Sequence, residues 1–191
     1  MNLFEHYKKH IDVLAESMEL IDPIKAYEFV DLLLNCKGKI FFTGVGKNGH
    51  VAAKATSTFS SIGLPCFFIN PVDSVHGDMG VINKGDILVA ISKSGNTEEL
   101  IHFLKHVEHK KCKIVSIHSN PKNKSLDYSS LDIDLRVSKE ADHLNIVPTC
   151  SIAVFTIFLQ SVACEISERK QLTLEQFVKN HPGGSIGQIK I

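Results

Sequence analysis

The first 36 residues carry apolar side chains at the spacing of two consecutive helices. In the first of them the apolar positions recur at steps of three and four: Leu3, Tyr7, Ile11, Leu14, Met18 and Ile21. This period predicts an amphipathic helix. Asp22 and Pro23 then provide an N-cap and a first-turn proline, which start a second helix. Gly38 ends that helix, so we predict two N-terminal helices within residues 1–36.

After Gly38 the pattern changes to short apolar runs rich in branched and aromatic residues, as in buried strands. Five such runs occupy residues 39–43, 66–69, 87–91, 113–117 and 133–137. Helical patterns separate most of them, which indicates a parallel sheet covered on both faces. We therefore predict an α/β fold, a three-layer α-β-α sandwich with a five-stranded parallel sheet. Residues 1–191 should form a single domain, with the α/β core and C-terminal helices in residues 37–191.

The C-terminal part of the chain contains two further helical patterns. Pro148 opens a helix that is apolar on most sides, as a helix buried in the core or against another subunit would be. Thr173 and Gln176 have the spacing of a capping box for a short last helix. The segment His181-Pro182-Gly183-Gly184 should end that helix.

Composition argues against several classes of protein, among them disordered, nucleic-acid-binding, disulfide-rich and membrane-spanning proteins. Hydrophobic residues make up 43% of the chain and the formal net charge is zero, which argues against disorder and against a nucleic-acid partner. The five cysteines form no C-x-x-C motif and are odd in number, which fits a reducing cytoplasm rather than a disulfide scaffold. The N-terminus lacks the apolar segment of a signal peptide, and no apolar run approaches the length of a membrane span. We therefore expect a cytoplasmic protein without a membrane partner.

The strand predicted at residues 87–91 runs into a loop rich in hydroxyl groups, and a helical pattern follows the loop. The free N–H groups and the positive dipole end of such a helix favour a bound anion. The loop can add neutral donors to a phosphate from three hydroxyl groups, with one glycine and one amide between them: Ser92, Ser94, Gly95, Asn96 and Thr97. The alternative is an ordinary polar loop between a strand and a helix.

Ligands of parallel α/β sheets bind at the carboxyl ends of the strands, a rule that places residues 44–50, 70–80 and 92–97 on one rim. Residues 44–49 match the dinucleotide-binding pattern G-x-G-x-x-G, but the acid expected near the end of the second strand is missing. We instead expect Gly46 to allow close approach of the backbone to a ligand, and Lys47 to face that ligand as a cation. The alternative is a tight turn with a solvated lysine.

Four more side chains are candidates for the rim, each with a structural alternative. His76 lies in a glycine-containing loop and is either a turn residue or part of the site wall. Glu99 either completes a capping box with Asn96 or acts as a carboxylate beside sugar hydroxyls. Glu140 follows the fifth predicted strand and is either a solvated residue or a base. His181 is either a structural residue or part of the site.

Three further histidines, His102, His106 and His109, have helical spacing that resembles a metal site. They lie near a predicted helix C-terminus beside two lysines, where cationic groups are favourable. We therefore expect them to be surface residues and expect no metal site.

Taken together, these segments resemble the sugar isomerase (SIS) domain family, in its arabinose-5-phosphate isomerase branch. The resemblance spans roughly residues 35–187 and rests on five motifs: Gly44-Val45-Gly46-Lys47-Asn48-Gly49-His50, His76-Gly77-Asp78-Met79-Gly80, Ile91-Ser92-Lys93-Ser94-Gly95-Asn96-Thr97, Lys139-Glu140 with Pro148-Thr149, and His181-Pro182-Gly183-Gly184. It implies a flavodoxin-like SIS fold. It also implies reversible conversion of D-arabinose 5-phosphate and D-ribulose 5-phosphate through an enediol. That reaction supplies the precursor of 3-deoxy-D-manno-octulosonate (Kdo), an acidic sugar of lipopolysaccharide and some capsules.

The resemblance implies a set of site residues as well. It carries the catalytic roles over to Lys47, Glu99, Glu140 and His181, and makes His76 a further site residue. The other residues implied to bind the sugar phosphate are Gly46, Asn48, Ser92, Ser94, Gly95, Asn96 and Thr97. The resemblance implies no redox cofactor, no required metal, and a homo-oligomer that we expect to be a tetramer.

Two loops depart from the family pattern. Asn48 stands where a serine is frequent, and Lys93 and Asn96 stand where asparagine and glutamate are frequent. Many relatives carry paired CBS modules after the SIS domain, and residues up to Ile191 contain none, so we expect the form without them. An isomerase of another sugar phosphate and a non-catalytic sugar-phosphate-binding regulator remain the alternatives. The neutral charge argues against a transcription regulator.

Overall fold

Two helices precede the sheet in the computed structural model, which describes residues 2–190. Helix α1 spans Leu3–Leu20 and begins with a capping box between Asn2 and Glu5. Helix α2 spans Pro23–Leu34, and the Asp22 carboxylate accepts hydrogen bonds from the backbone N–H groups of its first turn. The two predicted N-terminal helices are therefore confirmed, with Asp22 as the predicted N-cap.

Five parallel strands form one sheet in the order β2-β1-β3-β4-β5. Their bounds are β1 Ile40–Gly44, β2 Cys66–Phe68, β3 Ile87–Ile91, β4 Lys113–His118 and β5 Leu131–Asp134. The central strands β1 and β3 are buried along their whole length, which explains their continuous apolar runs. Strand β5 ends at Asp134 rather than at residue 137, because Arg136 adopts a left-handed backbone conformation with φ 47°.

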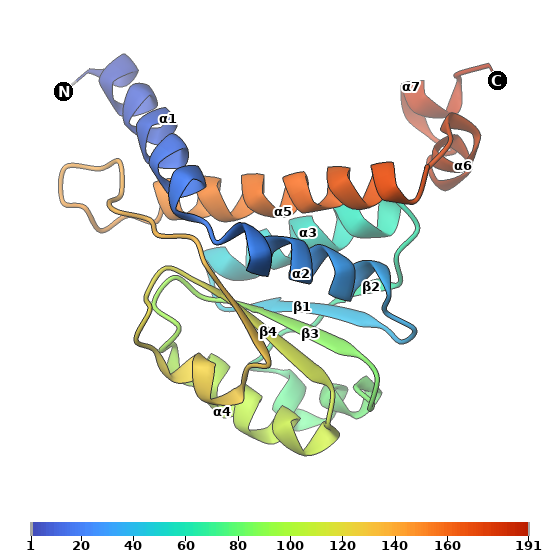
Figure 1. The fold of residues 1–191 in the computed structure, drawn as a ribbon, viewed down its shortest axis with the longest axis horizontal. Helices are drawn as coiled ribbons and strands as arrows, with labels where there is room; N and C mark the ends of the chain where they lie inside the picture. The colour runs from blue at the N-terminus through green and yellow to red at the C-terminus, as the bar shows by residue number, and fades with distance from the viewer. Residues whose placement is uncertain (1, 191) are drawn as a thin grey trace.

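Helices cover both faces of the sheet and make the predicted three-layer fold (Figure 1). Helix α3 spans Lys47–Ser61 and packs with α1, α2 and α5 on one face, where the larger hydrophobic core lies. Helix α4, Glu98–Val107, lies on the opposite face over a second core. Short 3-10 helices occupy connecting segments: Ser74–His76, Asp78–Val81, Glu108–Lys110 and Lys124–Tyr128.

Helix α5, Cys150–Arg169, is the long apolar helix predicted after Pro148. It packs against α1, α2 and α3, and Phe155, Leu159 and Ile166 are buried along it. Among the described residues it is the one helix long and apolar enough to cross a membrane by length and composition. Half of the qualifying window is buried inside the protein, as in the core helix of a soluble protein, so this match is weak evidence for a membrane span.

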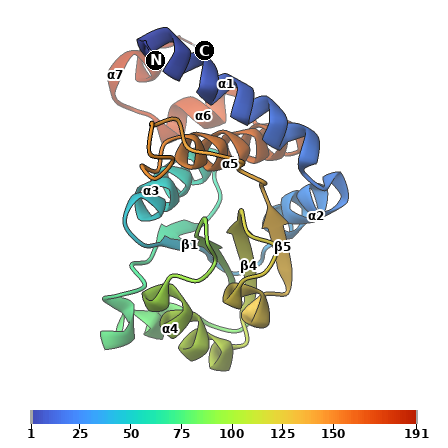
Figure 2. The same ribbon diagram turned by 90° about the vertical axis from the view of Figure 1, so that its left-hand side faces the viewer.

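The chain ends in two short helices, α6 Leu174–Asn180 and α7 Gly184–Gly187. Thr173 and Gln176 form the predicted capping box of α6. Both helices lie beyond the C-terminal end of α5, away from the loop that precedes this helix (Figures 1 and 2). One contact fixes where α6 ends, because the Asn180 side-chain amide donates to the Ser61 carbonyl at 3.1 Å, at the last residue of α3.

Candidate functional site

The loop between β3 and α4 folds around its own hydroxyl groups. The Ser92 and Thr97 hydroxyl oxygens lie 3.0 Å apart, and the Gly95 N–H donates to Ser92 Oγ at 3.2 Å. The Asn96 N–H donates to Ser94 Oγ at 3.1 Å. Gly95 has φ +62°, and a Cβ atom there would collide with the side chain of Asn123. The conformation of the loop therefore requires glycine at this position.

This loop lines an open cavity of about 320 Å³ at the carboxyl edge of the sheet. Residues that follow β1 and β4 line it as well. The full lining is Asn48, Ser92, Lys93, Ser94, Thr97, Ser119 and Asn120. Helix α4 begins beside the cavity without a side-chain cap on its first N–H groups. Uncapped N–H groups and the positive end of the helix dipole stabilise an anion. The structure thus brings the predicted hydroxyl groups together where a phosphate can accept from both the loop and the helix.

The turn between β1 and α3 reaches the same rim. Gly46 is the N-cap of α3, with φ 58° and ψ −126°, and Lys47 is the exposed first residue of the helix. A Cβ atom on Gly49 would lie 2.9 Å from the Gly44 carbonyl oxygen, so glycine lets α3 start close to β1. The Asn48 side-chain oxygen is buried, has no hydrogen-bond partner among the described residues, and belongs to a side chain that lines the cavity.

His76 and Glu99 face a neighbouring open cavity of about 500 Å³, which is lined by Pro71, Val72, Val75, His76, Glu98, Glu99 and His102. The capping-box alternative for Glu99 is wrong. Thr97 is the N-cap of α4 and makes no side-chain cap, and the Asn96 side-chain oxygen accepts from the Lys124 N–H at 2.8 Å. Glu99 therefore stands at the rim with its carboxylate unused by the helix start.

Glu140 is buried, with 1% of its surface exposed, so the solvated alternative is wrong. Its carboxylate oxygens accept from Lys93 Nζ at 2.6 Å, the Ser151 hydroxyl at 2.6 Å and the Thr149 N–H at 2.8 Å. Burial alone would raise the pKa of Glu140, but these bonds outweigh it and lower the pKa to about 2. Glu140 thus lies as an ionised group at the N-terminus of α5.

His181 lies apart from the other predicted catalytic residues. It follows α6, its ring stacks on Phe177 with 4.2 Å between centroids, and its Nδ1 lies 3.0 Å from the Phe177 carbonyl oxygen. Its neighbour Asn180 contacts Ser61 at one end of α3, whereas Lys47 is at the other end. A 15-residue helix is about 21 Å long. Lys47 and His181 of one chain are therefore not brought together.

The structure adds lining residues that the sequence reasoning missed. Ser119 and Asn120 follow β4 and line the cavity, so the strand-end rule that located the other loops applies to them too. Lys93 is the cation paired with Glu140, and Ser151 hydrogen-bonds the same carboxylate. No sequence signal pairs Lys93 with Glu140, because 47 positions separate them.

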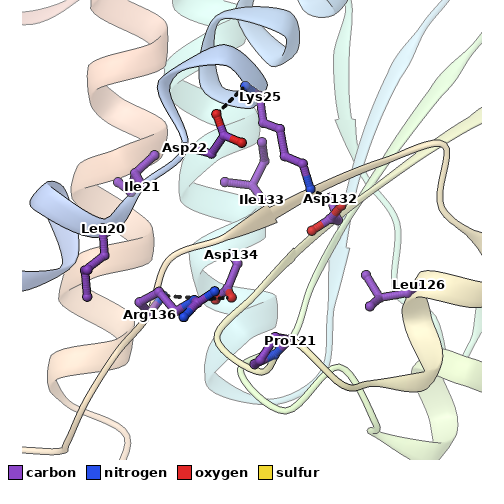
Figure 3. Close-up of a pocket in the computed structure, with 10 residues that line it drawn as sticks. All are labelled: Leu20, Ile21, Asp22, Lys25, Pro121, Leu126, Asp132, Ile133, Asp134 and Arg136. Carbon is purple, nitrogen blue, oxygen red and sulfur yellow. Dashed lines mark hydrogen bonds and ion pairs between the residues drawn. The ribbon is translucent and has the colours of Figure 1, made fainter.

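A different cavity of about 400 Å³ lies where α1 and α2 meet the end of β5 (Figure 3). Four of its charged groups form two pairs: Lys25 Nζ lies 2.6 Å from Asp132, and Arg136 pairs with Asp134. The Asp22 carboxylate instead accepts from the first-turn N–H groups of α2. None of the predicted site residues lines it.

His102 and His106 lie on α4, and His109 lies in the 3-10 helix that follows it. The rings of His102 and His106 pack edge to face with 4.7 Å between centroids. Within residues 2–190, no group of three or more potential ligands is arranged to hold a metal ion.

Comparison with known proteins places the chain in a family. The SIS domain family matches residues 33–165. The chain belongs to the SIS domain family. The SIS match covers the whole sheet, the loop between β3 and α4, and most of α5.

Two curated relatives are named arabinose 5-phosphate isomerase KdsD. The Francisella tularensis protein is 34% identical over 98% of this chain and 58% of its own length. The Pseudomonas aeruginosa protein is 36% identical over 87% of this chain and 50% of its own length. This SIS chain thus spans about half the length of the curated relatives it matches.

Solved structures share the fold closely. An Escherichia coli CFT073 protein in complex with arabinose 5-phosphate superimposes with a TM-score of 0.88 at 30% identity, covering 95% of this chain and 100% of that one. A Listeria monocytogenes protein provisionally assigned as a sugar-phosphate isomerase gives a TM-score of 0.91 at 29% identity, with 95% of both chains covered. The predicted SIS fold is therefore confirmed.

Proposed function

We propose that this chain is an aldose–ketose isomerase that interconverts D-arabinose 5-phosphate and D-ribulose 5-phosphate. The observation that carries the proposal is the hydroxyl cradle of Ser92, Ser94 and Thr97 at the uncapped start of α4, with Lys47 on the same rim. The relatives named arabinose 5-phosphate isomerase support the choice of sugar. The reaction would supply the Kdo precursor for lipopolysaccharide or capsule in the cytoplasm.

The chemistry moves two protons and needs no redox cofactor. A base removes the proton from C2 of the aldose, and the resulting enediolate is protonated at C1, while a hydroxyl proton passes from O2 to O1. Well-placed acid–base groups accelerate such transfers about 10²–10⁴-fold. Lys47 offsets the enediolate charge, and the cradle anchors the phosphate at the other end of the sugar.

We assign the acid–base roles to His181 and to Glu140, which would have to exchange one of its present hydrogen bonds for the substrate. Glu99 would orient sugar hydroxyls from the neighbouring cavity. His181 stands at the far end of α3 from Lys47, so we assign the His181 of a given site to a second copy of the chain. The active form is then a homo-oligomer, which we expect to be a tetramer. Exposed apolar side chains of α1, including Phe4, Tyr7 and Met18, offer a contact surface.

The decisive experiment is an isomerase assay on purified protein with EDTA present and with product analysis. Pentose, hexose and heptose phosphates are offered in turn. We expect turnover of arabinose 5-phosphate that EDTA does not reduce. Turnover of another sugar phosphate instead of arabinose 5-phosphate would identify that compound as the substrate and contradict the proposed one. A thermal shift with arabinose 5-phosphate but no turnover would favour a sugar-phosphate-binding regulator.

A further inference from the structure

Lys93 connects the loop of residues 92–97, here called the phosphate loop, to the buried carboxylate of Glu140. It follows Ser92 directly, and its carbonyl oxygen accepts from the Ser119 N–H at 3.0 Å, which fixes its backbone at the end of β4. Its ammonium lies 2.6 Å from Glu140 Oε1. The Lys93 side chain is 39% exposed and lines the cavity, whereas that of Glu140 is 1% exposed. One side chain therefore spans the distance from the cavity to the start of α5.

Glu140 has little capacity left for other partners. Oε1 accepts from Lys93 and from the Ser151 hydroxyl at 2.6 Å, and Oε2 accepts from the N–H groups of Thr149 and Ser151 at 2.8 and 3.1 Å. These four bonds match the roughly four acceptor sites of an ionised carboxylate, and the Thr149 hydroxyl adds a longer contact at 3.3 Å. Except for Lys93, the donors are neutral, so removing the ammonium would leave a buried charge with neutral partners alone.

Other ionisable groups stand near this carboxylate without bonding to it. From α1, His6 and Lys9 contact the Ala141 carbonyl oxygen at 3.1 and 3.2 Å. From α5, the Cys150 thiol lies in the field of Glu140, and burial together with that field raises the pKa of the thiol. Lys93 is the cation that contacts Glu140 directly within residues 2–190.

We propose that Lys93 is a positioning residue, whose ion pair with Glu140 fixes the phosphate loop against the start of α5 and holds the buried carboxylate in place. The lysine also places a positive charge next to neutral phosphate donors. Binding of the phosphate and placement of the acid–base group thus depend on the same side chain. A purely structural contact would stabilise the fold but would leave kcat and KM of the folded variant unchanged.

The kinetic test rests on the proposed function and compares Lys93→Met with Lys93→Arg. Lys105→Met on the exposed face of α4 is the matched control. We expect Lys93→Met to lower kcat/KM for arabinose 5-phosphate about tenfold, the loss of one charge-assisted hydrogen bond. We also expect the loss to appear in KM as well as in kcat, because the loop and the carboxylate are both displaced, and we expect Lys93→Arg to restore most of both. Values of kcat and KM for Lys93→Met equal to those of Lys105→Met would overturn the proposal.

A second test needs no turnover and separates this inference from the proposed function. The free energy of unfolding is measured against pH for the wild type, Lys93→Met, Glu140→Gln and the double variant. Because the pKa of Glu140 is lowered from 4.5 to about 2, its ionisation stabilises the fold above pH 4.5, and this stability is lost as the pH falls toward 2. The cost of Lys93→Met should therefore be largest near neutral pH and shrink on acidification.

The double variant decides whether the two residues act as a unit. We expect its loss to be clearly smaller than the sum of the two single losses. Additive losses in the free energy of unfolding would contradict the proposed coupling of Lys93 and Glu140. A cost of Lys93→Met that does not depend on pH would contradict it as well. A wild-type protein without arabinose 5-phosphate turnover would overturn the proposed function, while this cycle would still decide whether Lys93 positions Glu140.

Discussion

Gly44 of β1 and Ile91 of β3 are register partners at the carboxyl edge of the sheet. The chain leaves both strands at the same height, so the turn that starts α3 and the loop that starts α4 lie side by side. The positive ends of two helix dipoles consequently meet at one rim, with Asn48 and Ser92 lining a common cavity. The proposed phosphate site thus depends on strand register as much as on its hydroxyl groups.

Ser92→Ala should weaken substrate binding. The substitution removes a donor from the cavity and the partner of the Gly95 N–H and of the Thr97 hydroxyl. A neutral hydrogen bond is worth about 0.5–1.5 kcal/mol, so KM for the sugar phosphate should rise about threefold to tenfold. Steady-state kinetics on Ser92→Ala and on the exposed control Ser57→Ala tests this. Equal KM values in both variants would contradict the proposed binding of the phosphate by the Ser92 hydroxyl.

Gly46→Ala should destabilise the protein through its backbone alone. Gly46 has φ +58°, yet an added Cβ would meet nothing within 4 Å. A residue forced into such a conformation costs about 1–3 kcal/mol. Gly80 also has open space at its Cβ position but lacks a positive φ, so Gly80→Ala is a matched control. Urea unfolding should show the loss in Gly46→Ala and little change in Gly80→Ala.

Two inactive variants should complement each other when they share an oligomer. Lys47→Met and His181→Gln each damage every site in a pure preparation. If Lys47 and His181 of a site come from different copies, random mixed oligomers regain about a quarter of the wild-type sites. Co-expression followed by the isomerase assay measures this. Activity no higher than that of the separate variants would contradict the shared site.

The stability of the fold should fall when the pH drops below the ordinary pKa of histidine, partly because of His118. This side chain is 1% exposed, and burial lowers its pKa below 6.5, an effect that the Asp134 and Asp132 carboxylates only partly offset. The unfolded chain then binds the proton first, so unfolding becomes easier as the pH falls through about 6.5. His118→Asn should flatten this dependence in pH-dependent unfolding, whereas the exposed His106→Asn should retain it.

The sheet and its covering helices follow from sequence periodicity because burial on both faces leaves continuous apolar runs such as residues 87–91. The end of β5 could not be predicted from periodicity, because apolar positions continue to Val137 while the backbone turns at Arg136. The hydroxyl loop was visible as a local pattern. The burial and ionisation of Glu140 could not be predicted from the sequence. They depend on Lys93 and Ser151, which the fold brings together from distant segments.

Helix α3 acts as a spacer of about 21 Å between Lys47 and the segment that holds His181. Under the proposed shared site, an isolated chain carries two half-sites that never meet. Specific activity would then depend on protein concentration, falling on dilution as oligomers dissociate even though each chain stays folded. Catalytic activity would then depend on the equilibrium of self-association. Any ligand that stabilises the assembled form would therefore also act as an activator.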